Sequence, residues 1–97
     1  MWNKKIIVTK HAIKRFNQRH IKFSSFRNDP VEQILFDLRP LNVRKLEHLK
    51  GNNWKVTTNK GKVYIMIEDE KAWFVKTVFK TDIQYEFFKN KKIKKIN

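Results

Sequence analysis

The sequence predicts an α+β domain in which two N-terminal helices pack on an antiparallel sheet of about four strands, followed by a short C-terminal helix. Two segments between residues 9 and 40 repeat apolar side chains at helical spacing, whereas residues 54–80 alternate them as strands do. The length of 97 residues, 40% of them hydrophobic, suits one modest core. We expect residues 1–88 to form a single domain and residues 89–97 a mobile basic tail.

The first helix is predicted over residues 9–20, after a short apolar strand at residues 6–8. Thr9 is suited to the N-cap position, because its hydroxyl can accept a hydrogen bond from a free backbone N–H of the first turn. At about 100° per residue, the side chains form a packing face and a cationic face. The packing face holds Ala12, Ile13, Phe16 and His20, and the cationic face holds His11, Arg15, Gln18 and Arg19.

The second helix has the clearest start and stop signals. Asp29 as N-cap, Pro30 at the first helical position and Glu32 three residues after the cap form a capping box with an early proline. Pro40 ends the helix. The expected apolar stripe consists of Val31, Ile34, Leu35 and Leu38.

The rest of the chain has the pattern of a sheet. A strand within residues 41–49 is followed by a three-strand meander over residues 54–58, 63–68 and 72–80. The period of two predicts that Trp54, Val56, Val63, Ile65, Ile67, Trp73, Val75, Thr77 and Phe79 face the helices. The opposite face then carries Lys55, Tyr64, Met66, Phe74, Lys76 and Lys80. Residues 81–88 fit a strand, or a helix capped by Thr81 and Gln84, which we favour.

The composition is strongly basic. There are 23 Lys and Arg residues against 9 Asp and Glu, a formal net charge of +14, and no acidic residue precedes Asp29. Such a charge attracts polyanions, of which nucleic acid is the first candidate. The sequence has neither an 18-residue apolar run nor a signal-peptide pattern, so we expect a cytoplasmic protein without a membrane partner. The absence of cysteine excludes disulfides, thiolate metal sites and cysteine nucleophiles.

The cationic face of the first helix has the groups that RNA cleavage needs. His11 can transfer a proton, because the positive end of the helix lowers the pKa of its imidazole, while Arg15 and Arg19 can hold a phosphate. With Thr77 they define one candidate site, at the junction of helix and sheet. A second candidate site is the open sheet face, where lysines would meet phosphates and aromatic rings would stack on bases. The nucleic-acid contacts expected from both surfaces are Lys10, Lys14, Lys55, Tyr64, Lys76 and Lys80.

No metal or other cofactor is expected. The three histidines lack the spacing of zinc ligands, and two glycines cannot form a phosphate-binding loop.

Two short stretches resemble a known family. Residues 9–21 resemble the "HA-x-x-R-x-x-x-R-x-I" opening helix of the RelE/barnase/colicin-like nuclease superfamily, which includes the BrnT-like toxins. Residues 73–78 are similar to its closing strand, which ends in Thr and an apolar residue. The resemblance implies that residues 1–88 are a ribonuclease-toxin domain, with His11, Arg15, Arg19 and Thr77 as site residues and an acidic antitoxin as partner.

We therefore expect a metal-independent endoribonuclease, of the toxin type, that cleaves free or ribosome-bound RNA by attack of the 2′-hydroxyl. The alternative is a non-catalytic nucleic-acid-binding protein of phage or plasmid origin that uses the same basic surface.

Overall fold

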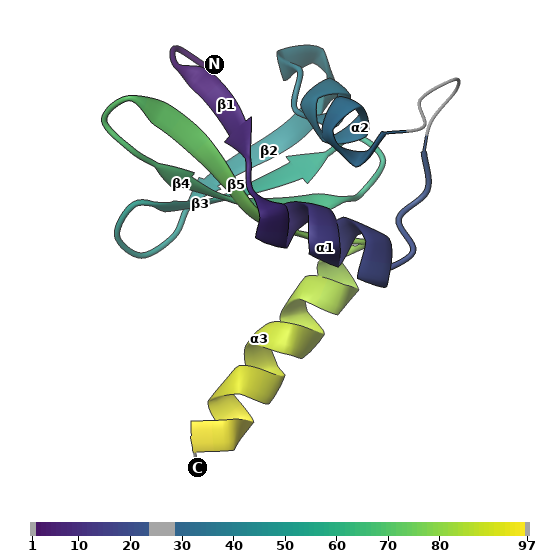
Figure 1. The fold of residues 1–97 in the computed structure, drawn as a ribbon. Helices are drawn as coiled ribbons and strands as arrows, with labels where there is room; N and C mark the ends of the chain where they lie inside the picture. The colour runs from purple at the N-terminus through teal and green to yellow at the C-terminus, as the bar shows by residue number, and fades with distance from the viewer. Residues whose placement is uncertain (1, 24–28, 97) are drawn as a thin grey trace.

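The computed structural model describes residues 2–23 and 29–96, with side chains up to Asn90. Within these residues the fold is α+β, with three α-helices and a five-stranded mixed sheet (Figure 1). The elements follow in the order β1 (Lys5–Val8), α1 (Lys10–Gln18), α2 (Pro30–Asp37), a 3-10 turn η1 (Pro40–Asn42), β2 (Val43–His48), β3 (Asn53–Thr58), β4 (Val63–Glu68), β5 (Ala72–Phe79) and α3 (Asp82–Ile96). None of these helices is long and apolar enough to cross a membrane.

The predicted arrangement of two N-terminal helices on an antiparallel sheet of about four strands is wrong. The strand order is β1-β5-β4-β3-β2, and β1 pairs in parallel with β5 while the other neighbours are antiparallel. One strand precedes the first helix, and a third helix of 15 residues follows the sheet. A short apolar segment such as β1 does not indicate which distant strand it will pair with, so no local pattern predicts this parallel edge.

Both ends of α1 are fixed by local hydrogen bonds. At the start, the Thr9 hydroxyl accepts from the Ala12 N–H at 3.1 Å, as predicted, and also donates to the Val75 carbonyl of β5 at 2.6 Å. At the end, the N–H groups of His20 and Ile21 bond back to the carbonyls of Asn17 and Phe16. This is a Schellman motif, with His20 in the left-handed conformation at φ 52°.

The expected apolar stripe of α2 is partly wrong. Asp29 caps the helix by accepting from the Val31 N–H, and Ile34 is fully buried. Leu35, however, is 40% exposed, while Gln33 and Asp37 are buried in its place. The helix turns Asp37 toward the sheet in place of Leu35, because the Asp37 carboxylate accepts hydrogen bonds there from Tyr64 and Lys62.

A bulge in β5 changes which side chains face the helices. Ile65 pairs with Thr77 and Met66 pairs with Val75, which leaves Lys76 without an opposite residue. Beyond the bulge, Thr77 therefore lies on the face away from α1 and α2. The same register shows that the prediction for β4 was inverted. Its even-numbered residues, Tyr64 and Met66, pack under the helices.

The two faces of the sheet have separate cores. Under α1 and α2 lie Ala12, Phe16, Ile21, Ile34, Leu38, Val56, Tyr64, Met66, Trp73, Val75 and Val78. On the opposite face a smaller cluster of Val63, Ile65 and Phe79 packs against Tyr85 of α3. The small cluster is what holds the start of α3.

Residues 81–88, which fitted either a helix or a strand, form the first part of α3. The Thr81 hydroxyl accepts from the Gln84 N–H at 3.1 Å, and the Gln84 side chain accepts from the Lys80 N–H at 2.7 Å. The helix continues to Ile96, so residues 89–96, expected to be a mobile tail, are helical. Figure 1 shows α3 running away from the sheet.

The left-handed conformation of His20 gives a stability prediction. This conformation costs a residue with a Cβ about 1–2 kcal/mol, and glycine avoids that cost. Part of the gain is lost, because glycine gives the unfolded chain more conformational freedom. We expect His20→Gly to raise the free energy of unfolding by about 0.5–1 kcal/mol in urea denaturation. Asn17→Gly, inside the same helix, is the control and should lower it. Destabilisation by both substitutions would contradict the left-handed conformation assigned to His20.

Candidate nucleic-acid interface

The cationic face of α1 points out of the core. His11, Lys10 and Lys14 are exposed, whereas Arg15 and Arg19 are half-buried. The opposite side of the helix is anchored by Ala12 and Phe16, which are 0% and 1% exposed. The helix is thus a rigid support for its cations, held at the start by β5 and at the end by the Schellman motif.

Arg19 joins three elements. Its Nη1 donates to the Thr77 hydroxyl at 3.1 Å and to the Val78 carbonyl at 2.9 Å, both in β5. Its Cζ lies 4.4 Å from the ring centroid of Phe79 and 4.6 Å from that of Phe88 in α3. Burial, and then the charge of Arg15, lower the pKa of Arg19, but a guanidinium remains charged at physiological pH. In the described part of the chain Nε and Nη2 have no hydrogen-bond partner, so they can bind an anion.

His11 and Arg15 are hydrogen-bonded on the exposed side. Arg15 Nε donates to His11 Nε2 at 3.4 Å, and Arg15 Nη1 donates to the Gln18 side chain at 2.7 Å. Because Nε2 accepts, the ring proton is assigned to Nδ1. Slight burial, followed by the charges of Arg15, Lys14, Arg19 and Lys76, lowers the pKa of His11 below its ordinary value of 6.5. A neutral imidazole follows from this environment, and its lone pair on Nε2 accepts the hydrogen bond from Arg15.

The bulge in β5 joins the two sites that the sequence analysis kept apart. Lys76, expected on the open sheet face, is exposed at the bulge and its charge acts on His11. Thr77, expected under the helices, lies on the other face and accepts from Arg19. The structure therefore brings His11, Arg15 and Arg19 together with both residues of β5, and we call these five residues the α1–β5 cluster.

Lys55 is not available to a nucleic acid. The residue is 7% exposed, and its Nζ lies 2.7 Å from Asp82, 3.8 Å from Glu47 and 4.4 Å from the ring centroid of Tyr85. Burial alone would lower the pKa of Lys55, but the hydrogen bond and charge of Asp82, with the charge of Glu47, raise it. Its ammonium is thus paired with carboxylates inside the protein. The prediction that Lys55 contacts a phosphate is corrected accordingly.

Tyr64 is likewise corrected, because it is fully buried and cannot stack on a base. Its hydroxyl donates to the Asp37 carboxylate at 2.6 Å, which also accepts from Lys62 at 2.7 Å and from Gln33 at 2.8 Å. Burial, and then the negative charge of Asp37, raise the pKa of Tyr64. The phenol therefore stays protonated and ties α2 to β4.

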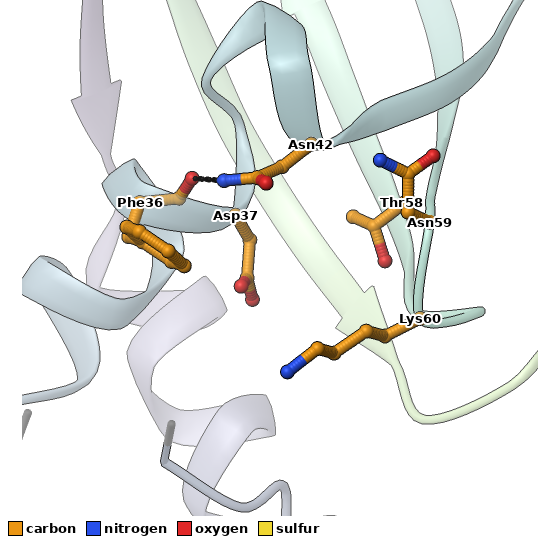
Figure 2. Close-up of a pocket in the computed structure, with 6 residues that line it drawn as sticks. All are labelled: Phe36, Asp37, Asn42, Thr58, Asn59 and Lys60. Atoms are coloured by element: carbon orange, nitrogen blue, oxygen red, sulfur yellow. Dashed lines mark hydrogen bonds between the residues drawn. The ribbon is translucent and has the colours of Figure 1, made fainter. Parts of the chain in front are cut away.

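Asp37 also lines a small hollow of about 60 Å³ between α2 and the turn after β3. Figure 2 shows its walls, with the Lys60 side chain reaching toward Asp37 and the Asn42 amide donating to the Phe36 carbonyl. The Asp37 carboxylate is already held by the three donors just described. We interpret this hollow as part of the structural packing of α2.

Among the described residues, the cations of the α1–β5 cluster have no acidic partner. In the described residues the ion pairs involve Lys4, Lys45, Lys55 and Lys62, and none involves a cation of α1 or Lys76. Lys80 is also exposed, at the end of β5. A surface of this kind attracts phosphates.

The sequence analysis missed Phe79 and Phe88 as residues that shape the cluster. Phe88 is 69 positions from Arg19 and lies in a segment that fitted either a helix or a strand. No local pattern marks such a contact. Gln18, whose side chain holds Arg15, lies on the cationic face of the helix, where the helical period placed it.

Comparison of the chain with family models, with curated proteins and with solved structures finds no match. The resemblance of the two short stretches is thus neither supported nor opposed by a relative. The function must be argued from the α1–β5 cluster.

The structural role of Tyr64 can be tested. Tyr64→Phe removes one donor from a buried carboxylate, so we expect the free energy of unfolding to fall by about 1–3 kcal/mol while RNA affinity is unchanged. In the described residues the Tyr85 hydroxyl makes no hydrogen bond, so Tyr85→Phe is the matched control and should cost less than about 0.5 kcal/mol. Urea denaturation and an RNA gel-shift titration measure the two quantities. Loss of RNA affinity in a stable Tyr64→Phe protein would indicate that Tyr64 contacts the RNA after all.

Proposed function

We propose that the protein is a metal-independent endoribonuclease whose site is the α1–β5 cluster. The observation that carries this proposal is the hydrogen bond between the exposed His11 ring and Arg15, with Arg19 on the same face of α1. The charges of both arginines lower the pKa of His11, which favours its neutral form. A base next to two phosphate-binding cations is the arrangement that cleavage by the 2′-hydroxyl requires.

The proposed reaction uses each residue in one role. When Arg15 turns from His11 to the phosphate, His11 Nε2 is free to take the proton of the ribose 2′-hydroxyl, whose oxygen attacks the adjacent phosphorus. The bond from phosphorus to the 5′ oxygen breaks, which leaves a 2′,3′-cyclic phosphate on one fragment and a 5′-hydroxyl on the other. The departing oxygen takes its proton from water, because the exposed site is open to solvent. Arg15 and Arg19 stabilise the charge on the phosphate, so the reaction needs no metal ion.

Thr77 acts as a positioning residue. Its hydroxyl and the Val78 carbonyl accept hydrogen bonds from Nη1 of Arg19, which holds the guanidinium in place and leaves Nε and Nη2 for a phosphate. Lys10, Lys14, Lys76 and Lys80 would contact neighbouring phosphates without reading the bases.

The proposal extends to a cytoplasmic toxin that acts on free or ribosome-bound RNA and is neutralised by an acidic antitoxin. The formal net charge of +14 and the uncompensated cations of α1 support it, because an acidic protein would compete with RNA for them.

A non-catalytic nucleic-acid-binding protein is the second candidate. It is favoured by the presence of a single histidine in the α1–β5 cluster, since base and acid catalysis are often divided between two groups. Both candidates use the same surface, and only cleavage separates them.

The test is incubation of labelled RNA with the purified protein in EDTA, with and without ribosomes. We expect fragments that end in 2′,3′-cyclic phosphate, and a rate reduced about 100-fold or more by His11→Ala with RNA affinity nearly unchanged. His48→Ala, which alters an exposed histidine of β2, is the matched control and should keep the parent rate. RNA that stays intact in both conditions but binds in a salt-sensitive way would contradict the enzyme and favour the binding protein.

The same assay gives a pH profile. Because the neutral form of His11 is active and its pKa is lowered, we expect the rate to rise with pH and to level off below pH 6.5. A profile that still rises above neutral pH would mean that another group is the base.

A further inference from the structure

The α3 helix exposes an aromatic ring beside the cation cluster. Phe87 is 60% exposed, although burial of a phenylalanine is favourable, and Phe88 is 37% exposed. The two ring centroids are 5.5 Å apart and the rings are nearly perpendicular, at 87°. Phe88 in turn lies against Arg19, with 4.6 Å between its centroid and Cζ. Phe87 is therefore the outer member of a contact series that ends on the phosphate-binding guanidinium.

Phe88 has less free surface for a ligand than Phe87. It contacts the Phe79 ring at 5.9 Å, the Arg19 guanidinium and the Phe87 ring. Phe87 has no ring contact in the described residues other than Phe88. The open ring in this series is thus Phe87.

The surroundings of Phe87 indicate the kind of ligand. Lys89 is exposed in the same helix and Lys80 is exposed just before it. Among the described residues, Nε and Nη2 of Arg19 have no hydrogen-bond partner. A ligand that places a flat ring on Phe87 and negative charge on these cations is a nucleic-acid strand. Because a base must be unpaired to stack on a protein ring, the strand is single-stranded.

We propose that Phe87 is a base-stacking residue, which binds a base of a single-stranded RNA whose phosphate lies on Arg19. The choice of RNA rests on the proposed function, while the stacking contact does not require cleavage. Phe87 would select unpaired RNA over a duplex, and it would do so without preference for one base.

The experiment measures binding of the full chain to a single-stranded RNA oligonucleotide that contains 2-aminopurine. Stacking quenches the fluorescence of this base, and anisotropy of an end label gives the affinity. We expect quenching with the parent, and an affinity about 5- to 150-fold weaker for Phe87→Ala. Phe87→Trp should restore both. Ile83→Ala is the matched control, since Ile83 lies one turn earlier in α3 and is 82% exposed, and it should bind within twofold of the parent.

Three results would overturn the proposal. The first is a Phe87→Ala protein that binds within twofold of the parent. The second is an absence of quenching at every 2-aminopurine position, or of RNA binding altogether. The third is an effect of Phe87→Ala on self-association alone, seen by light scattering, which would assign the ring to a second copy of the chain. If the base stacks on Phe87 but the RNA is not cleaved, only the proposed ribonuclease activity is refuted. If Phe87→Ala cleaves RNA and binds it as tightly as the parent does, only the proposed stacking contact is refuted.

Discussion

The Arg19 guanidinium is the point at which the separate parts of this fold are joined. The β1 strand ends opposite Val75, so the edge of β5 beyond it has no strand neighbour from β1, and Arg19 of α1 donates to the Val78 carbonyl there. The same group lies between the Phe79 and Phe88 rings. A lysine could not replace it, because the planar fork both stacks on rings and donates in several directions. This contact adds to the small cluster that holds the start of α3 and to the burial of Ala12 and Phe16 that anchors α1.

The bulge in β5 determines what Arg19 can reach. Without the extra residue at Lys76, the regular alternation would put Thr77 under the helices and turn Lys76 away from α1. The bulge instead exposes Lys76 near His11 and presents the Thr77 hydroxyl to Arg19. Bulges often redirect a side chain next to a functional site, and this one gathers groups from two faces of the sheet.

Features set by neighbouring residues could be predicted from the sequence. The Thr9 and Asp29 caps and the bounds of β4 follow from local patterns and are as expected. The parallel pairing of β1, the bulge at Lys76 and the contact of Phe88 with Arg19 depend on residues far apart in the chain, so no local pattern indicates them. The length of α3 was not predicted either. Its lysine-rich end has the composition of a charged tail, although lysine is a good helix former.

The binding of phosphate to the cationic face of α1, proposed above, can be tested directly. The most direct measurement is an NMR titration of the protein with a ribodinucleotide monophosphate, followed at the arginine Nε–H groups and the histidine rings. We expect chemical-shift changes at Arg15, Arg19 and His11, with Arg39 and Arg44, both exposed and outside α1, unchanged. Changes at Arg39 and Arg44 that leave the α1 groups unaffected would contradict it.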